Sequence, residues 1–82
     1  MKIPETFVAI DLETTGLEFE KDEIIEIALV RFVNGKPFES CDFLVKPSQT
    51  LRPFIEHLTG ITSEDLANAE DFPAIAEKVF SF

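Results

Sequence analysis

The sequence is poor in cysteine, in basic residues and in long apolar runs, and each shortage excludes a class of protein. Cys41 is the single cysteine among 82 residues, so the chain forms no internal disulfide. The 7 Lys and Arg residues against 16 Asp and Glu residues give a formal net charge of -9. This balance excludes a basic patch that grips a phosphate backbone by charge alone. Any contact with nucleic acid therefore needs metal ions or another segment.

Signals for a membrane or for export are also missing from these residues. No apolar run approaches the roughly 18 residues that a membrane helix needs, and no apolar leader begins with Lys or Arg. We therefore expect a reduced, cytoplasmic protein. What is present is 45% hydrophobic residues, including nine Phe, which is enough to fold. With 82 residues there is room for one small domain at most.

Three runs of strand-forming residues open the chain. Residues 6–12 are almost continuously apolar, which is typical of a central strand covered on both faces. Residues 23–33 alternate so that both faces are again largely apolar. Asn34-Gly35 separates this run from residues 37–45 and favours a two-residue hairpin turn, because both residues tolerate positive φ. The second and third strands should therefore pair antiparallel.

The second half of the chain carries helix signals. A short helical turn reaches Leu58, and Thr62 with Asp65 predicts a capping box for a helix over 63–68. Asp71 caps a last helix over 73–82. Its apolar stripe consists of Ile75, Ala76, Val79, Phe80 and Phe82. That helix has no stop signal, so we expect the chain to be truncated.

Asp11 and Glu13 are the first candidates for chemistry. Two carboxylates one residue apart on a strand point to the same face, with Cα atoms roughly 6.5 Å apart. No Lys, Arg or His lies within five residues on either side, so a hard divalent cation such as Mg²⁺ or Mn²⁺ is the economical partner. The alternative is a strand end that emerges into solvent.

The wider string contains FVAIDLETTGL, then DEIIEIALVRFVNGK, and later LTGIT. This order resembles the DEDD family of 3′–5′ exonucleases, which includes the epsilon subunit of bacterial DNA polymerase III and ribonucleases similar to RNase T. The resemblance implies an α/β, ribonuclease H-like fold, of which residues 1–82 would be the N-terminal portion: three strands, mostly antiparallel, followed by helices. If the next strand is missing, strand 6–12 leaves an apolar edge unpaired, and the fragment is expected to dimerise through it.

The resemblance also implies roles for the residues around the pair. Asp11 would touch both of two metal ions and Glu13 one, with Mg²⁺ or Mn²⁺ as the cofactor. The 3′-terminal nucleotide would be bordered by Thr14, Thr15, Gly16 and Leu17. The alternative for this segment is an ordinary strand-to-loop turn, with Thr as a hydroxyl cap and Gly supplying an unusual φ. Glu26 is either an edge residue that reaches solvent or an acceptor for the hydroxyls of Thr14 or Thr15.

Two later motifs of the family are absent, namely His-Asn-x-x-Phe-Asp and the helix with the catalytic His and last Asp. We therefore predict that this chain alone does not cleave nucleic acid. The complete protein would be a two-metal 3′–5′ exonuclease acting on a single-stranded or frayed 3′ end, in proofreading or repair, with a polymerase or helicase as a partner. A different class stays open, a non-catalytic module that binds a protein partner or a nucleic-acid end.

Three other features of the sequence do not indicate a catalytic or metal-binding site. His57 does not match the catalytic histidine of the family and is expected on the surface or in packing. Cys41 alternates with Phe43 and Val45 on one strand face, which is typical of a small core residue. The acidic run of residues 18–23 lacks the spacing of a calcium loop, so we expect a solvated loop.

Overall fold

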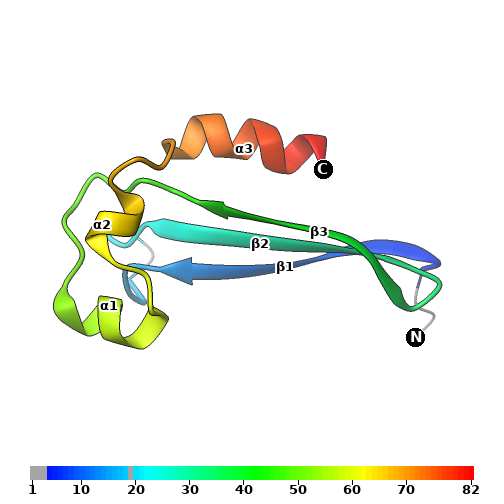
Figure 1. Ribbon diagram of the computed structural model, residues 1–82, viewed down its shortest axis with the longest axis horizontal. Coiled ribbons are helices and arrows are strands. Elements are labelled where there is room, and N and C mark those ends of the chain that lie inside the picture. Colours follow the sequence, from blue (N-terminus) through cyan, green and yellow to red (C-terminus); the bar gives the residue numbers. More distant parts are fainter. Residues whose placement is uncertain (1–3, 19) are drawn as a thin grey trace.

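The computed structural model describes residues 4–18 and 20–82, which form a three-stranded antiparallel sheet followed by three helices (Figure 1). The strands are β1 (Thr6–Thr14), β2 (Ile24–Val33) and β3 (Lys36–Leu44). The helices are α1 (Pro53–Thr59), α2 (Ser63–Leu66) and α3 (Phe72–Ser81). The predicted class, a mostly antiparallel sheet followed by helices, is confirmed.

The hairpin between β2 and β3 turns on Asn34-Gly35, as predicted. Both residues have positive φ, 52° and 78°, and Val33 pairs with Lys36 across the two-residue turn. A bulge follows, since Phe32 pairs with Pro37 whereas Arg31 pairs with Glu39. The bulge shifts the register by one residue for the rest of β3, and this shift decides which side chains reach each face.

The first strand is an edge of this sheet and not its centre. The order is β1-β2-β3, so β2 lies in the middle, and the expectation of a central strand at 6–12 is wrong for the sheet that the described residues form. Its apolar side chains are not covered on both faces either: Val8 is 45% exposed, Ile10 58% and Leu12 43%. The expected apolar edge is present, since β2 is the one strand paired with β1 in the described residues.

Helix α3 covers one face of the sheet. Figure 1 shows it running alongside β3, and its buried Ile75 packs with Ile27, Leu29 and Val45. Cys41 and Phe43 pack against the same cluster, which confirms the interpretation of Cys41 as a core residue. The predicted stripe is wrong at one position, because Phe80 is 90% exposed.

The far end of α3 also contacts the sheet. The Phe82 ring packs beneath the Arg31 guanidinium, 4.4 Å from its centroid, and Arg31 also pairs with Glu39. A cation over an aromatic face is attracted by the ring quadrupole, so this contact helps to fix α3 along its length.

Helices α1 and α2 close the end of the sheet at which β2 begins (Figure 1). Ile25 is fully buried there, packed with Leu51, Ile55, Ile61 and Leu66.

The predicted N-terminal caps of α2 and α3 are confirmed, since Thr62 and Asp65 form the capping box of α2 and Asp71 caps α3. Gly60 ends α1 at a φ of 76°. Helix α2 is shorter than the predicted 63–68. Within residues 4–18 and 20–82 we find no helix with both the length and the apolarity that a membrane crossing requires.

Candidate active site

Asp11 and Glu13 lie on the sheet face opposite α3. They pair with Ala28 and Glu26 of β2, and residues paired across an antiparallel ladder share a face. Asp11 is exposed and Glu13 is half-buried. The prediction that the two carboxylates share one face therefore agrees with the register, and neither is closed off from a ligand.

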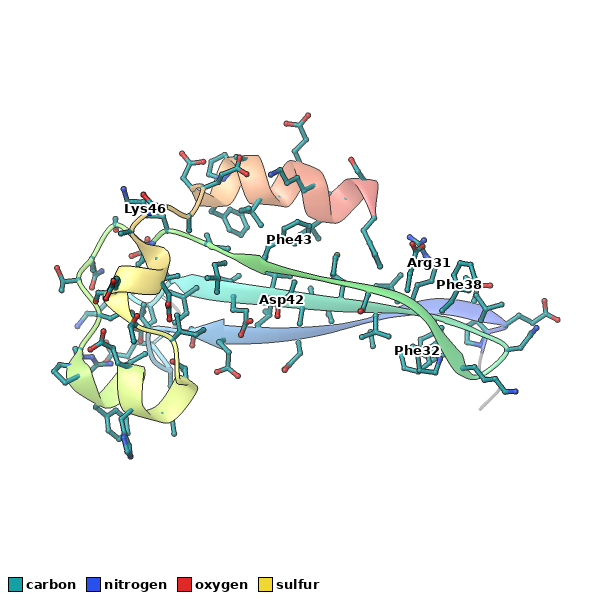
Figure 2. The ribbon with its side chains drawn as sticks, viewed as in Figure 1. Arg31, Phe32, Phe38, Asp42, Phe43 and Lys46 are labelled. Carbon is teal, nitrogen blue, oxygen red and sulfur yellow. The ribbon has the colours of Figure 1, made fainter. Side chains whose placement is uncertain are left out.

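A carboxylate from each of the other strands joins them on this face. Glu26 lies directly opposite Glu13, and Asp42 of β3 lies opposite Ala28. Figure 2 shows Asp42 and Phe43 pointing to opposite sides of the sheet, with Phe43 toward α3. Four acids thus gather across three strands, and we call them the acidic face: Asp11, Glu13, Glu26 and Asp42.

The carboxylates of the acidic face influence one another. The pKa of Glu26 is raised to about 7, chiefly by its hydrogen bond to the Asp42 carboxyl and then by partial burial. The charges of Asp42, Glu13 and Asp11 raise the pKa further. Part of this shift in pKa is thus repulsion among the carboxylates, which a bound cation would offset.

Glu26 has a different partner from the one considered from sequence. The Thr14 hydroxyl donates to the Gly16 carbonyl at 2.6 Å, and the Thr15 hydroxyl donates to Asp22 at 2.8 Å. Glu26 thus accepts from neither hydroxyl, and that hypothesis is wrong. The hydroxyls turn toward their own loop because they follow the irregularity between Glu13 and Thr14, where the strand leaves its register.

The loop after β1 carries the remaining predicted site residues, Thr14 to Leu17. Thr15 is buried, with 7% of its surface exposed, whereas Leu17 is fully exposed. Gly16 does not adopt a left-handed backbone, unlike Gly35 and Gly60, so an unusual φ is not the reason for this glycine. The side chain of Thr15 therefore holds the loop, and Leu17 is the one that faces outward.

The acids do not complete a metal centre by themselves. In the described part of the chain there is no group of three or more His, Cys, Asp and Glu side chains arranged to hold an ion. His57 lies exposed on α1, as expected of a surface residue. Asp11 and Glu13 nonetheless offer the hard oxygen donors that Mg²⁺ and Mn²⁺ prefer, in a surplus of negative charge.

Sequence reasoning missed three residues near this site. Asp42 alternates with the core-facing Cys41, and it was missed because the sequence alone does not show that it lies beside Ala28, on the face of Asp11. Asp22 was assigned to a solvated loop, but its side chain accepts hydrogen bonds from Thr15 and from the Glu18 backbone. Arg52 lies 37 positions from Thr15, to which it donates, and no local pattern signals such a contact.

Comparisons with known proteins show the family to which the chain belongs. A family model described as an exonuclease, RNase T, matches residues 8–82. The 3′-5′ exonuclease DinG of Bacillus subtilis is 43% identical over 77 residues, covering 93% of this chain and 8% of that protein. DNA polymerase III subunit epsilon of Aquifex aeolicus is 38% identical over 77 residues, covering 94% and 38%.

A solved structure agrees with these relatives. The nuclease domain of 3′hExo, a DEDDh family member bound to rAMP, superimposes with a TM-score of 0.83 at 28% identity, covering 94% of this chain and 42% of that one. The chain thus spans less than half the length of each of these proteins. The structure and the relatives agree on one fold, of ribonuclease H-like type, and the chain belongs to the RNase T family of exonucleases.

Proposed function

We propose that this chain is the N-terminal portion of a single metal-dependent 3′–5′ exonuclease domain, which hydrolyses phosphodiester bonds at nucleic-acid 3′ ends. The observation that carries the proposal is the acidic face, where Asp11 and Glu13 lie open beside Glu26 and Asp42. The loop that presents Leu17 follows Glu13 directly along the chain. A cation site and a surface for a nucleotide are thus adjacent in sequence.

Asp11 and Glu13 would hold two Mg²⁺ or Mn²⁺ ions, Asp11 both and Glu13 one. Such ions generate a nucleophile from water near neutral pH and stabilise the leaving 3′-oxygen. The negative charges of Asp11 and Glu13 would hold the ions, and Glu26 and Asp42 would add to the negative potential around them. Bound cations would also offset the repulsion between this chain, whose net charge is -9, and a negatively charged phosphodiester.

The loop would border the 3′-terminal nucleotide. Leu17 offers an exposed apolar side chain to the base, and Thr14 and Gly16 would border the nucleotide beside it. Thr15 would border the nucleotide by holding the loop in place, because its hydroxyl already donates to Asp22 and its backbone N–H to the Glu23 carbonyl. A single-stranded or frayed end is the substrate proposed, with DNA favoured by the DinG and polymerase III relatives.

The chain alone is proposed to be inactive, because it carries two of the four metal-binding acids implied by its family and lacks the histidine that would act as base. The complete protein would work in the cytoplasm in proofreading or repair, beside a polymerase or helicase. The isolated chain would dimerise through the open edge of β1, where Val8, Ile10 and Leu12 are exposed.

The test of the cation site is Mn²⁺ binding by the chain, followed by NMR line broadening. We expect Mn²⁺ to broaden the amide signals of Leu12 and Glu13 in the wild-type chain and to leave them sharp in Asp11→Ala. Glu64→Ala removes an exposed acid on α2 and should leave the broadening intact. Equal broadening in wild type and Asp11→Ala would contradict the proposal.

A second candidate, a non-catalytic module that binds a partner or a nucleic-acid end, is favoured by the incomplete set of ligands. The two functions differ in what the full-length protein does with a 3′-labelled strand and Mn²⁺. Release of mononucleotides supports the exonuclease, whereas retention of the intact strand in a complex supports the module.

A further inference from the structure

The loop after β1 is anchored through Thr15, the one buried polar residue in the described core. Its N–H donates to the Glu23 carbonyl at 2.9 Å, and its hydroxyl accepts from the Glu23 N–H at 2.9 Å. The same hydroxyl donates to Asp22 Oδ1 at 2.8 Å. Every polar group of Thr15 except its carbonyl is thus satisfied by two adjacent residues.

Asp22 closes the loop from its other end. Its second oxygen, Oδ2, accepts from the Glu18 N–H at 2.7 Å, and its own N–H donates to the Glu18 carbonyl at 2.7 Å. The bond from the Glu18 backbone is the main reason that the pKa of Asp22 is lowered, followed by the bond from Thr15. One ionised carboxylate therefore bridges the residues before and after Gly16 and Leu17.

Arg52 supplies the remaining contact. It precedes α1 and donates from Nη2 to the Thr15 carbonyl at 2.9 Å, and its charge also acts on Asp22. The guanidinium thus joins two parts of the chain that are 37 positions apart. Because Arg presents a planar set of donors, such a contact fixes direction as well as distance.

Gly16 shows how closely these side chains approach the loop. A Cβ built on Gly16 would lie 2.5 Å from Asp22 Oδ2 and 2.9 Å from Arg52 Nη2. Asp22 already accepts two hydrogen bonds, so it has little freedom to move away. Glycine is needed here to admit the two side chains.

These contacts hold the loop on both sides of Leu17, at Thr15 and at Glu18. Leu17 is fully exposed, next to a shallow hollow lined by Glu18, Lys21, Asp22, Gln49 and Arg52. We propose that Asp22 and Arg52 are positioning residues, which act through Thr15 and Gly16 to hold Leu17 against the base of the 3′-terminal nucleotide. This inference rests on the proposed exonuclease function and extends it to residues that contact neither the ions nor the reacting phosphate.

The test compares Asp22→Ala and Arg52→Ala with wild type in the full-length protein on a 3′-labelled DNA strand. A displaced loop should raise KM about tenfold and lower kcat far less, because positioning of the terminal nucleotide is impaired while Asp11 and Glu13 are untouched. Mn²⁺ affinity should be unchanged. Gly16→Ala should reproduce the Asp22→Ala phenotype, since its Cβ displaces Asp22.

Three controls separate this role from a merely structural one. Glu20→Gln removes an exposed acid of the same loop and should leave KM unchanged. Asp22→Asn and Arg52→Lys, which keep size or charge, should raise KM less than Asp22→Ala and Arg52→Ala do. Amide exchange of Glu18 should speed up in Asp22→Ala while the β2 amides stay protected.

The outcomes separate the two proposals. An unchanged KM in Asp22→Ala and Arg52→Ala overturns the positioning role, and so does an equal loss of Mn²⁺ affinity and kcat. A wild-type protein that binds Mn²⁺ but releases no nucleotide overturns the exonuclease function itself. A selective rise in KM, with the expected Glu18 exchange, supports both.

Discussion

At the scale of single residues, two effects balance on the acidic face: repulsion between ionised carboxylates, and the hydrogen bond between protonated Glu26 and Asp42. Glu26 has a pKa of about 7, above its ordinary value of 4.5, so the folded chain holds a proton there that the unfolded chain loses. Its favourable contribution is complete below about pH 4.5 and is lost as the pH rises through 7. Without metal, the folded chain should therefore be less stable at pH 8 than at pH 5 from this cause.

Asp42→Asn tests that balance. At pH 5 the substitution weakens the hydrogen bond that protonated Glu26 donates to the carboxylate, so stability should not rise. At pH 8 it removes the repulsion between two ionised carboxylates, which is worth up to about 1 kcal/mol across strands, so the metal-free chain should gain stability. The change corresponds to a rise in Tm of roughly 4–8 °C for a domain of this size. Thermal unfolding at both pH values measures it, with Glu64→Gln as the exposed control. Equal effects at the two pH values would argue against the Glu26–Asp42 pair.

Asp22 should show the opposite pH dependence. Its pKa lies below the ordinary 3.8, chiefly because the Glu18 backbone N–H donates to its ionised form. Stability from this bond is complete above about pH 3.8 and is lost as the pH falls through the lowered pKa. Asp22→Asn should therefore lower stability at pH 7 and flatten its acid dependence below pH 4, as urea unfolding across that range can show. A parallel shift at every pH would contradict this assignment.

At the scale of elements, turn and cap signals could be predicted from sequence because they are local. Asn34-Gly35 and the capping residues Thr62 and Asp71 act over three or four positions, and the structure has each of them. The bulge at Pro37 and Phe38 could not be predicted in the same way, because alternation assumes an unbroken register. One extra residue there sets which residues of β2 lie beside those of β3, so the strand could be predicted whereas the position of Asp42 beside Ala28 could not.

The first strand shows the other limit of prediction from sequence. Its apolar run indicated a strand covered on both faces, yet Ile10 is 58% exposed, because a continuous apolar sequence does not say which element covers it. Asp11 and Glu13 could still be placed correctly on one face, because that depends only on the two-residue period.

The open edge of β1 predicts self-association of the isolated chain. Ile10→Lys places a charge on the exposed apolar side of the edge strand and should convert dimers or larger species to monomers at micromolar concentration. Phe80→Lys removes an equally apolar and 90% exposed side chain from α3 and should leave the association unchanged. Sedimentation velocity distinguishes the two. A wild-type chain that is already monomeric would contradict the proposed pairing.

At the scale of the whole molecule, the two faces of the sheet differ in what covers them. Helix α3 buries one face through Ile75, while the opposite face presents the acids of all three strands. Helices α1 and α2 close one end, and Arg52 beside α1 reaches the loop that follows the acids.

The most direct test of the central claim, that Asp11 belongs to a metal-dependent 3′–5′ nuclease site, is nucleotide release from a 3′-labelled single strand by the full-length protein in Mn²⁺. The account predicts release in wild type and a loss of more than about a hundredfold in Asp11→Ala, because the ions provide several kcal/mol of charge stabilisation. Undiminished release in Asp11→Ala would contradict the claim.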